Sequence, residues 1–301
     1  MPDCAAYSPL KEKFGEHCVF GAPASGFTTY RAGGPAEVLV RPGSREDLLW
    51  LAGWCRAAGV RLTLLGRGSN VLVSDKGLPG VTVLTGRLSG IKVSGRTITA
   101  EAGALWDDVA RLSAELGLAG LDKTAGIPGS VGGAVRMNAG AFGQETFDRL
   151  VWVEALDQAG GLLRLEKKDI PHGYRRAEGL EKLILLSAGF EFEAGDIAVL
   201  LQDRSCVLAA RETKQPLEFP SAGSVFKRPP GDYASRLIDA AGLKGFRIGG
   251  AEVSAKHAGF IINSGGATAA DIYALMCEVR ARVKAGSGVE LELEQILLGD
   301  F

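Results

Sequence analysis

Residues 124–143 read Thr-Ala-Gly-Ile-Pro-Gly-Ser-Val-Gly-Gly-Ala-Val-Arg-Met-Asn-Ala-Gly-Ala-Phe-Gly and carry one charged side chain, Arg136. So many glycines are unfavourable inside a strand or a helix, whereas a solvent-exposed linker would carry more serine, lysine and glutamate. The composition favours a backbone that lies against a large planar ligand and donates N–H groups to ring heteroatoms or to phosphate. For this segment alone, a glycine-rich crossing through the core remains an alternative.

A second glycine loop directly follows an apolar strand expected over residues 61–65, and it consists of Gly66, Arg67, Gly68, Ser69 and Asn70. Two glycines around one residue allow successive N–H groups to point into one concavity that suits a pyrophosphate. The side chains of Ser69 and Asn70 add donors. The loop is no Rossmann fingerprint, because the third glycine is missing and a strand is expected to follow. A plain turn is the alternative for this loop.

Three further patterns complete the set: Tyr30-Arg31-Ala32-Gly33-Gly34-Pro35-Ala36, Ala222-Gly223-Ser224-Val225-Phe226-Lys227 and Gly288-Val289-Glu290-Leu291-Glu292-Leu293-Glu294. In this order and spacing, from about Thr28 to Gly299, the chain resembles the UDP-N-acetylenolpyruvoylglucosamine reductases, the FAD enzymes of bacterial peptidoglycan precursor synthesis. The resemblance implies an α+β protein with a two-subdomain FAD-binding fold of the vanillyl-alcohol-oxidase (PCMH) type and a C-terminal α+β substrate domain. It also implies the compact class, which lacks an added substrate-capping insertion.

The resemblance implies that the two glycine loops clamp the diphosphate and the isoalloxazine ring of FAD. The cofactor-binding candidates are Gly66, Arg67, Gly68, Ser69, Asn70, Gly126, Ile127, Pro128, Gly129, Ser130, Gly132, Gly133, Ala134, Asn138 and Gly140. Some relatives attach flavin through His or Cys, and neither occurs in these loops, so we expect non-covalent FAD. The family usually has Asn-Thr or His-Thr just before Thr28, where this chain has Gly26-Phe27. We expect little consequence, because the backbone would still contact the cofactor.

Reduction of an enol ether requires a hydride, a proton donor and stabilisation of an enolate that spreads onto a carboxylate. The resemblance implies Ser224 as the proton donor, with Arg175 and Glu294 at the enolate. Judged by residue type alone, each has a structural alternative: a turn serine, a solvated arginine and a solvated acidic strand face. On that strand face Glu290, Glu292 and Glu294 would alternate with buried leucines, and Glu292 is the fallback for Glu294.

The substrate-binding candidates are Tyr174, Lys227, Arg228 and Asn263. The chain departs from the family pattern at three positions near the candidate site. Ala177 replaces a small hydroxyl residue, Leu293 a frequent proline and Gln295 a frequent valine.

The composition argues against several classes of partner. The chain has 301 residues with 34 basic and 35 acidic side chains, a net charge of −1, so we expect neither nucleic acid nor a membrane surface as partner. No apolar run approaches the ~20 residues of a membrane helix, and the start at Met1-Pro2-Asp3-Cys4 lacks signal-peptide features. Five scattered cysteines and three dispersed histidines predict reduced thiols and no metal site. We expect a cytoplasmic monomer.

The pattern of caps and apolar periodicity predicts three α+β units, at residues 1–86, 87–213 and 214–301, with the last strand a candidate to pack back on the FAD domain. Predicted helices follow Ser44 and cover 105–116, 197–211, 233–241 and 268–285, the last with Thr268 as its cap. Predicted strands include a hairpin at 91–102 and segments at 150–156, 162–165, 183–192, 259–263 and 291–298.

The function that the resemblance implies is reduction of UDP-N-acetylglucosamine enolpyruvate to UDP-N-acetylmuramate, with FAD as cofactor and NADPH as reductant. Two alternatives stand beside it. Another flavin oxidoreductase of the same fold, such as an alcohol oxidase, would share the glycine loops without requiring residues 222–227 or the terminal glutamates. A catalytically silent nucleotide-sugar or flavin-binding protein would not require Ser224, Arg175 and Glu294.

Overall fold

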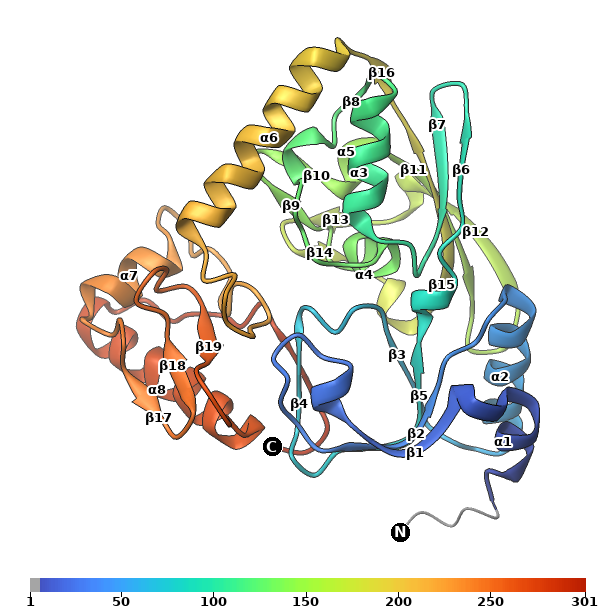
Figure 1. Cartoon of the computed structure of the whole chain (residues 1–301), viewed down its shortest axis with the longest axis horizontal. Helices are drawn as coiled ribbons and strands as arrows, with labels where there is room; N and C mark the ends of the chain where they lie inside the picture. Colours follow the sequence, from blue (N-terminus) through green and yellow to red (C-terminus); the bar gives the residue numbers. More distant parts are fainter. Residues whose placement is uncertain (1–5) are drawn as a thin grey trace.

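The computed structural model describes residues 6–301, which form three bodies in chain order (Figure 1). The first body contains a four-stranded sheet in the order β1–β2–β5–β3. Its strands are β1 (Cys18–Pro23), β2 (Pro35–Val40), β3 (Leu62–Leu65) and β5 (Leu78–Leu84), with helices α1 (Ser8–Phe14) and α2 (Arg45–Ala57) packed against them. The cap of α2 is as predicted, because the Ser44 side chain accepts a hydrogen bond from the Asp47 amide.

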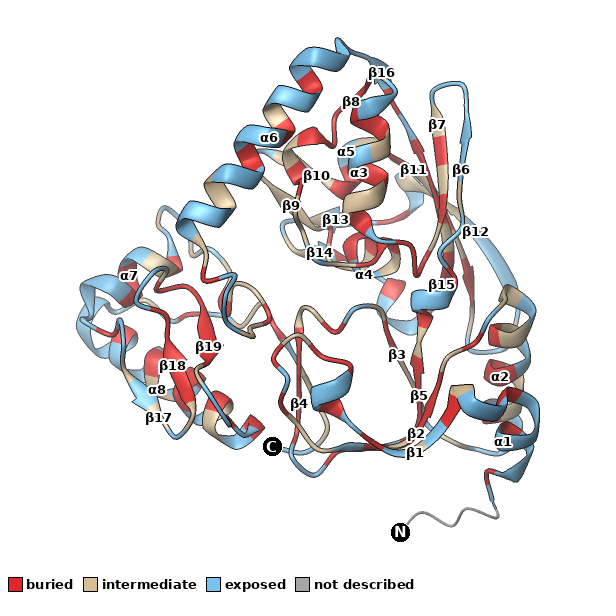
Figure 2. Ribbon diagram, in the orientation of Figure 1, coloured by how far each residue is buried: buried red, intermediate tan, exposed pale blue. Residues whose placement is uncertain are grey.

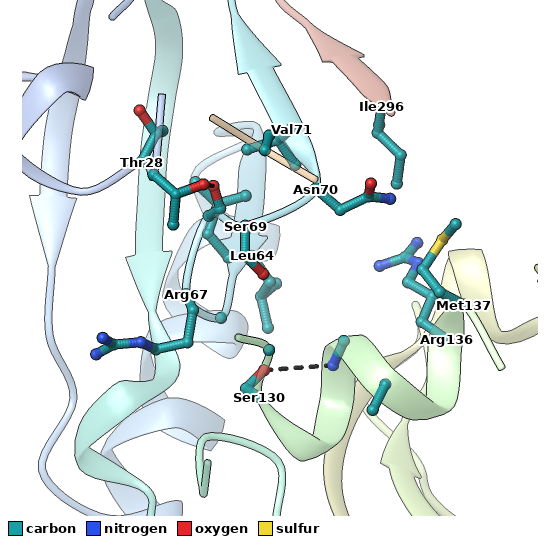
Figure 3. A pocket seen from close by; sticks show the side chains of 18 of the residues that line it. Thr28, Leu64, Arg67, Ser69, Asn70, Val71, Ser130, Arg136, Met137 and Ile296 are labelled. Atoms are coloured by element: carbon teal, nitrogen blue, oxygen red, sulfur yellow. Dashed lines mark hydrogen bonds between the residues drawn. The ribbon is translucent and has the colours of Figure 1, made fainter. Parts of the chain in front are cut away.

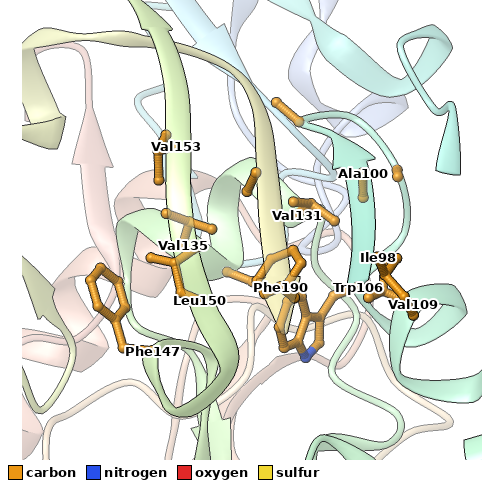
Figure 4. Close-up of a cluster of buried hydrophobic side chains, with 14 of the residues drawn as sticks. Ile98, Ala100, Trp106, Val109, Val131, Val135, Phe147, Leu150, Val153 and Phe190 are labelled. Carbon is orange, nitrogen blue, oxygen red and sulfur yellow. The ribbon is translucent and has the colours of Figure 1, made fainter. Parts of the chain in front are cut away.

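The second body is built on a five-stranded antiparallel sheet in the order β12–β11–β15–β7–β6. Its strands are β6 (Ile91–Ser94), β7 (Thr97–Glu101), β11 (Leu150–Leu156), β12 (Leu162–Glu166) and β15 (Ile184–Glu191). Helices α3 (Trp106–Glu115) and α4 (Val131–Arg136) pack on this sheet around the fully buried Trp106 and Phe190 (Figure 4). The hairpins and helix predicted here are present, with ends shifted by one or two residues.

Helix α6 (Ile197–Lys214) connects the second body to the third (Figure 1). Most of its surface is exposed, and its buried residues are Leu200, Arg204 and Val207 (Figure 2). The third body contains α7 (Ala234–Ala240), β17 (Arg247–Ile248), β18 (Ala251–Val253), β19 (Ile261–Asn263) and α8 (Ala269–Ser287). Helix α8 begins with the predicted capping box of Thr268 and Asp271.

The last strand is shorter than predicted. Strand β20 covers Ile296–Leu298, whereas we predicted a strand over residues 291–298. It pairs in parallel with β4 (Val71–Val73) of the first body. The preceding residues are irregular because they pass between two bodies: Leu291 is buried in the core of the third, and Leu293 makes only a single bridge, to Phe226.

The segment 124–143 also differs from our prediction. It contains the short helix α4, although we judged its glycine content unfavourable for a helix. Ser130 caps this helix by accepting a hydrogen bond from the Gly133 amide. A Cβ atom at Gly132 would lie 3.1 Å from the Cβ of Ala102, so this glycine permits close packing of the helix on the chain after β7.

Two further structural facts concern partners and cofactors. Within residues 6–301 no helix is long and apolar enough to span a bilayer, and no group of three His, Cys, Asp or Glu side chains is arranged to hold a metal ion. Cys18, Cys55, Cys206 and Cys277 are free thiols, and Cys4 lies outside the described residues.

Candidate active site

A cavity of about 1660 Å³ lies where the three bodies meet. Both glycine loops contribute to its wall, through residues 66–70 and through residues 126–130, 133–134 and 139–141. Arg175, Ser224 and Glu294 line the same cavity. Chain folding thus brings the three catalytic candidates and both predicted cofactor loops to one site.

The two glycine loops approach each other closely, and glycine is required for that approach (Figure 3). A Cβ atom at Gly66 would collide with the hydroxyl oxygen of Ser130 in the second loop. Gly68 has a φ of +61°, and a Cβ there would lie 2.5 Å from the carbonyl oxygen of Phe27. Gly26 and Phe27, which replace the usual pair of the family pattern, line the cavity.

The wall of the cavity fits a cofactor that carries a diphosphate. In the described part of the chain, the backbone N–H groups of Arg67, Gly68 and Ser69 have no protein acceptor. The lining includes eleven lysine and arginine side chains but only four carboxylates, although the chain as a whole is nearly neutral. Free amides in a positively charged cleft are suited to phosphate oxygens.

Arg175 is placed by a tight hairpin between β13 (His172–Gly173) and β14 (Arg176–Ala177). It is the second residue of the two-residue turn and adopts a φ of +54°, a strained backbone conformation for a non-glycine residue. Its Nε lies 2.9 Å from Oε1 of Glu294, and one terminal nitrogen donates to the carbonyl oxygen of Gly140 at 2.8 Å. The Arg175 side chain is only 18% exposed, so it is not a solvated surface arginine.

The three terminal glutamates, which we predicted on one strand face, differ in burial and in partners. Glu290 pairs with Arg280 and Lys284, and Glu292 pairs with Lys227. Only Glu294 reaches the cavity, with its side chain 13% exposed, so the fallback residue Glu292 lies outside the site. Burial raises the pKa of the Glu294 carboxyl, and the charges of Arg175 and Lys227 offset part of that rise.

Ser224 lies on the wall of the cavity, directly after Gly223, whose φ is +74°. It forms a single β-bridge with Phe260. The next residue, Val225, accepts a hydrogen bond at its carbonyl oxygen from the Glu294 amide at 2.9 Å. The backbone therefore ties the serine loop to the segment that carries Glu294.

Five predicted site residues do not line the cavity: Gly132, Asn138, Tyr174, Lys227 and Asn263. Asn138 is fully buried, and its side-chain amide contacts Glu145, the carbonyl oxygen of Gly173 and the Phe147 amide. It therefore supports the hairpin that carries Arg175. The Asn263 side chain likewise bonds the backbone of Tyr30, Gly265 and Ala267.

Tyr174 lies beside Arg175 of the charged pair and also contacts Arg228. The Arg175 guanidinium lies 4.9 Å from the ring centroid of Tyr174, and the Tyr174 hydroxyl accepts a hydrogen bond from the Arg228 amide at 3.3 Å. Arg228 lines the cavity, whereas the Lys227 ammonium is paired with Glu292.

Sequence reasoning missed a partly buried ion pair behind the second glycine loop. Asp107 accepts the Gly126 amide at 2.6 Å and two hydrogen bonds from Arg204, at 2.9 and 2.6 Å. Burial raises the pKa of Asp107, but the bonds from Arg204 and Gly126 outweigh it and hold that pKa below its ordinary value. The available signal was Arg204 itself, which falls between Leu200 and Val207 on the buried face of α6.

A second missed residue is Arg211, also on α6. It lines the cavity beside Gly126, and its buried Nε has no hydrogen-bond partner among residues 6–301. Burial lowers the pKa of its guanidinium, with the Arg175 charge adding to that effect.

Comparison with known proteins gives consistent results for both halves of the chain. An FAD binding domain family matches residues 36–166, and the C-terminal domain family of UDP-N-acetylenolpyruvoylglucosamine reductase matches residues 215–298. The reductase of Lactococcus lactis subsp. cremoris (strain SK11) is 44% identical over 282 residues, covering 93% of this chain and 94% of the relative. That of Clostridium perfringens (strain SM101 / Type A) is 41% identical over 295 residues, 97% of each chain.

The crystal structure of UDP-N-acetylenolpyruvylglucosamine reductase (MurB) from Thermus caldophilus superimposes with a TM-score of 0.79 at 34% identity, over 94% of this chain and 98% of that one. These matches confirm the predicted fold class, an FAD-binding domain followed by a C-terminal α+β domain.

Proposed function

Because this chain belongs to the UDP-N-acetylenolpyruvoylglucosamine reductase family of oxidoreductases in peptidoglycan precursor synthesis, we propose that it uses NADPH to reduce UDP-N-acetylglucosamine enolpyruvate to UDP-N-acetylmuramate. The observation that carries this proposal is the convergence of Ser224, Arg175 and Glu294 on one cavity whose other walls are the two glycine loops. A catalytically silent binding protein would have no need for that convergence.

The cofactor assignment follows from the walls of the cavity. We assign FAD, bound without a covalent link, to residues 66–70 and 126–130 with Gly133, Ala134 and Gly140. Gly132 and Asn138 leave this set, because they support the wall from behind. When bound, FAD supplies the hydride that adds to one carbon of the double bond.

Arg175 and Glu294 are positioned to stabilise the enolate. Two nitrogens of the Arg175 guanidinium are engaged by Glu294 and Gly140, while its other terminal nitrogen has no acceptor in the described chain. That nitrogen is available to the substrate carboxylate, on which the negative charge develops. Glu294 is the second group that we assign to these oxygens, and burial raises the pKa of its carboxyl.

Ser224 donates the proton to the second carbon. A serine hydroxyl is a weak acid, but a carbanion alpha to a carboxylate is a strong base, so the transfer is favourable once the donor is in reach. The uridine diphosphate requires cations at some distance from this centre. Arg228 is our candidate for that contact, because it lines the cavity while Lys227 is held by Glu292.

Anaerobic stopped-flow absorbance of the purified holoenzyme tests the proposal. NADPH should bleach the flavin absorbance, and the enolpyruvyl substrate should restore it with formation of UDP-N-acetylmuramate. Flavin reduction by NADH, measured in parallel, gives the preference between NADPH and NADH. Flavin reduction by simple alcohols tests the alcohol-oxidase alternative. A flavin that alcohols reduce and the enolpyruvyl substrate does not reoxidise would overturn the proposal.

We propose that the functional units are those predicted from the sequence, 1–86, 87–213 and 214–301, and that the protein works as a cytoplasmic monomer. Close packing of the first and third units on each other supports this proposal, because the core of the third body includes Tyr30 and Leu72 from the first body. Light scattering coupled to size exclusion tests the monomer, and a mass of twice 31.5 kDa would contradict it.

A further inference from the structure

A buried polar network lies behind the cavity wall that carries Ser224 and Glu294. Tyr30 is fully buried, and Gln295 is 4% exposed. The Tyr30 hydroxyl donates to Oε1 of Gln295 at 2.9 Å. The Gln295 Nε2 donates to the carbonyl oxygens of Ala222 and Gly223, at 3.0 and 3.2 Å. Every polar atom of the Gln295 side chain is therefore satisfied within the protein.

The network joins residues that are the chain neighbours of Glu294 and Ser224. Gln295 directly follows Glu294, and Ala222 and Gly223 directly precede Ser224. On the other side of Ser224, the Val225 carbonyl oxygen accepts the Glu294 amide. Two hydrogen-bonded ties, one before and one after the serine, thus connect its loop to the segment of the catalytic glutamate.

The serine loop depends on such ties, because it has little regular structure of its own. Gly223 has a positive φ, and Ser224 is held to the neighbouring chain by a single bridge. Two carbonyl oxygens of this loop point to the buried amide of Gln295. Without that amide both oxygens would lose this donor, and the Ala222 oxygen would lose it at a buried position.

The serine loop decides which way the amide points. A glutamine side chain has a donor end and an acceptor end, and either orientation fills the same space. The carbonyl oxygens of Ala222 and Gly223 can only accept, so Nε2 faces them, and Oε1 is left to accept the hydrogen bond of the Tyr30 hydroxyl. Burial raises the pKa of Tyr30 well above its ordinary value, so this hydroxyl keeps its proton.

We propose that Gln295 is a positioning residue, whose amide fixes the Ser224 loop against Glu294, and that the Tyr30 hydroxyl anchors the other end of this amide. The inference rests on the proposed function, since it assigns the network to the step in which Ser224 gives its proton. Gln295 touches neither the cavity nor the reacting atoms, so its effect acts through the serine loop.

Two variants separate this role from general stability. Gln295→Leu removes the amide at similar volume, and Tyr30→Phe removes only the hydroxyl and is the milder change. Ser113→Ala is the matched control, because it removes a buried hydrogen bond, to the Ala110 carbonyl oxygen, in a helix that does not line the cavity.

In stopped-flow experiments, Gln295→Leu should slow flavin reoxidation by the enolpyruvyl substrate about tenfold to a hundredfold, because a small misplacement of a reacting group has effects of this size. Flavin reduction by NADPH should stay within about twofold, because no proton from Ser224 is needed there. The solvent deuterium isotope effect on reoxidation should rise, and kcat should fall at nearly constant KM. Tyr30→Phe should move each quantity in the same direction by less.

Hydrogen–deuterium exchange supplies a readout that does not depend on activity. A peptide covering residues 221–226 should exchange faster in Gln295→Leu and Tyr30→Phe than in wild type or Ser113→Ala. Unchanged exchange in that peptide, or equal slowing of both half-reactions, overturns the positioning role. If the substrate fails to reoxidise the flavin of the wild-type enzyme, the proposed function is refuted instead. The hydrogen–deuterium exchange result still decides whether Gln295 orders the loop.

Discussion

Arg175 and Glu294 form an ion pair, with 2.9 Å between Nε and Oε1, although 119 residues separate them in the chain. The arginine lies in the turn of a hairpin of the second body, and the glutamate lies on the segment that returns to the first. The pair is therefore made only when all the bodies are assembled, and its burial makes it sensitive to the loss of either partner.

The first prediction concerns Ser224. Ser224→Ala should leave flavin reduction by NADPH nearly unchanged and slow reoxidation by the substrate by several orders of magnitude, because only the second half-reaction needs its proton. Stopped-flow absorbance resolves the two halves. Ser221→Ala, which alters another serine of the same cavity wall, is the control and should keep both rates. Equal slowing of both halves in Ser224→Ala would show that the serine is structural.

The second prediction compares two neighbouring glutamates. Glu294→Gln should reduce kcat roughly 10²–10³-fold, because it alters one preorganised contact to the developing charge. Arg175→Lys should have an effect of similar size, since lysine keeps the charge without the planar fork. Glu292→Gln is the matched control and should stay active, because Glu292 is 71% exposed and faces Lys227 outside the cavity. Steady-state kinetics with UDP as a competitive probe should show UDP affinity unchanged within a few-fold.

The third prediction follows from the raised pKa of Glu294. A carboxyl whose pKa is higher in the folded state stabilises the fold below its unfolded pKa of about 4.3, and that contribution is lost as the pH rises through the folded value. Relative to Glu294→Gln, wild type should therefore lose stability as the pH rises above about 4.3. Denaturant titrations of both proteins at a series of pH values below and above that point measure the difference. A difference that stays constant with pH would show that burial does not penalise this charge.

The fourth prediction concerns Asp107. Asp107→Asn should weaken FAD binding to the apoprotein several-fold, because the Gly126 amide and Arg204 lose their charged acceptor. It should also lower the free energy of unfolding by about 1–3 kcal/mol, since Arg204 stays buried with a poorer partner. Flavin fluorescence titration and denaturant unfolding give the two quantities. Asp108→Asn, next in the chain and exposed, should change neither. If Asp107→Asn destabilises the fold but binds FAD normally, the loop does not depend on this carboxylate.

The fifth prediction is that FAD is held without a covalent bond. Neither glycine loop contains His or Cys, so no side chain there offers a point of attachment. Acid precipitation of the purified protein should therefore release all yellow colour into the supernatant. Colour retained in the pellet would contradict the prediction.

The elements that the sequence predicts well are those with local signals. The helices that follow Ser44 and Thr268 begin where their caps indicate, because the cap contacts lie within one turn of the chain. The hairpin of β6 and β7 likewise depends on a local turn. For the candidate site, the motifs predict that Ser224, Arg175 and Glu294 act together, and the fold brings all three to one cavity.

The failures come from contacts between distant segments. The acidic alternation at Glu290, Glu292 and Glu294 is typical of a strand, but the regular strand covers only Ile296–Leu298, and Leu293 adds a single bridge to Phe226. The amides of Asn138 and Asn263 suit a ligand equally well, and only the fold shows that other groups of the protein already occupy them. Asp107 and Arg204 stand 97 residues apart, so no local pattern connects them.

The parallel pairing of β4 with β20 has a consequence for biosynthesis. Asn70 precedes β4 and bonds the Glu294 carbonyl oxygen through its side chain, across 224 residues of chain. While the ribosome is still adding residues before Ile296, β4 lacks this neighbouring strand, and the cofactor cavity lacks one wall. Such long-range closure is slow in folding. The nascent protein therefore cannot complete its flavin site until Ile296–Leu298 have left the ribosome, and assembly of the holoenzyme must wait for these residues.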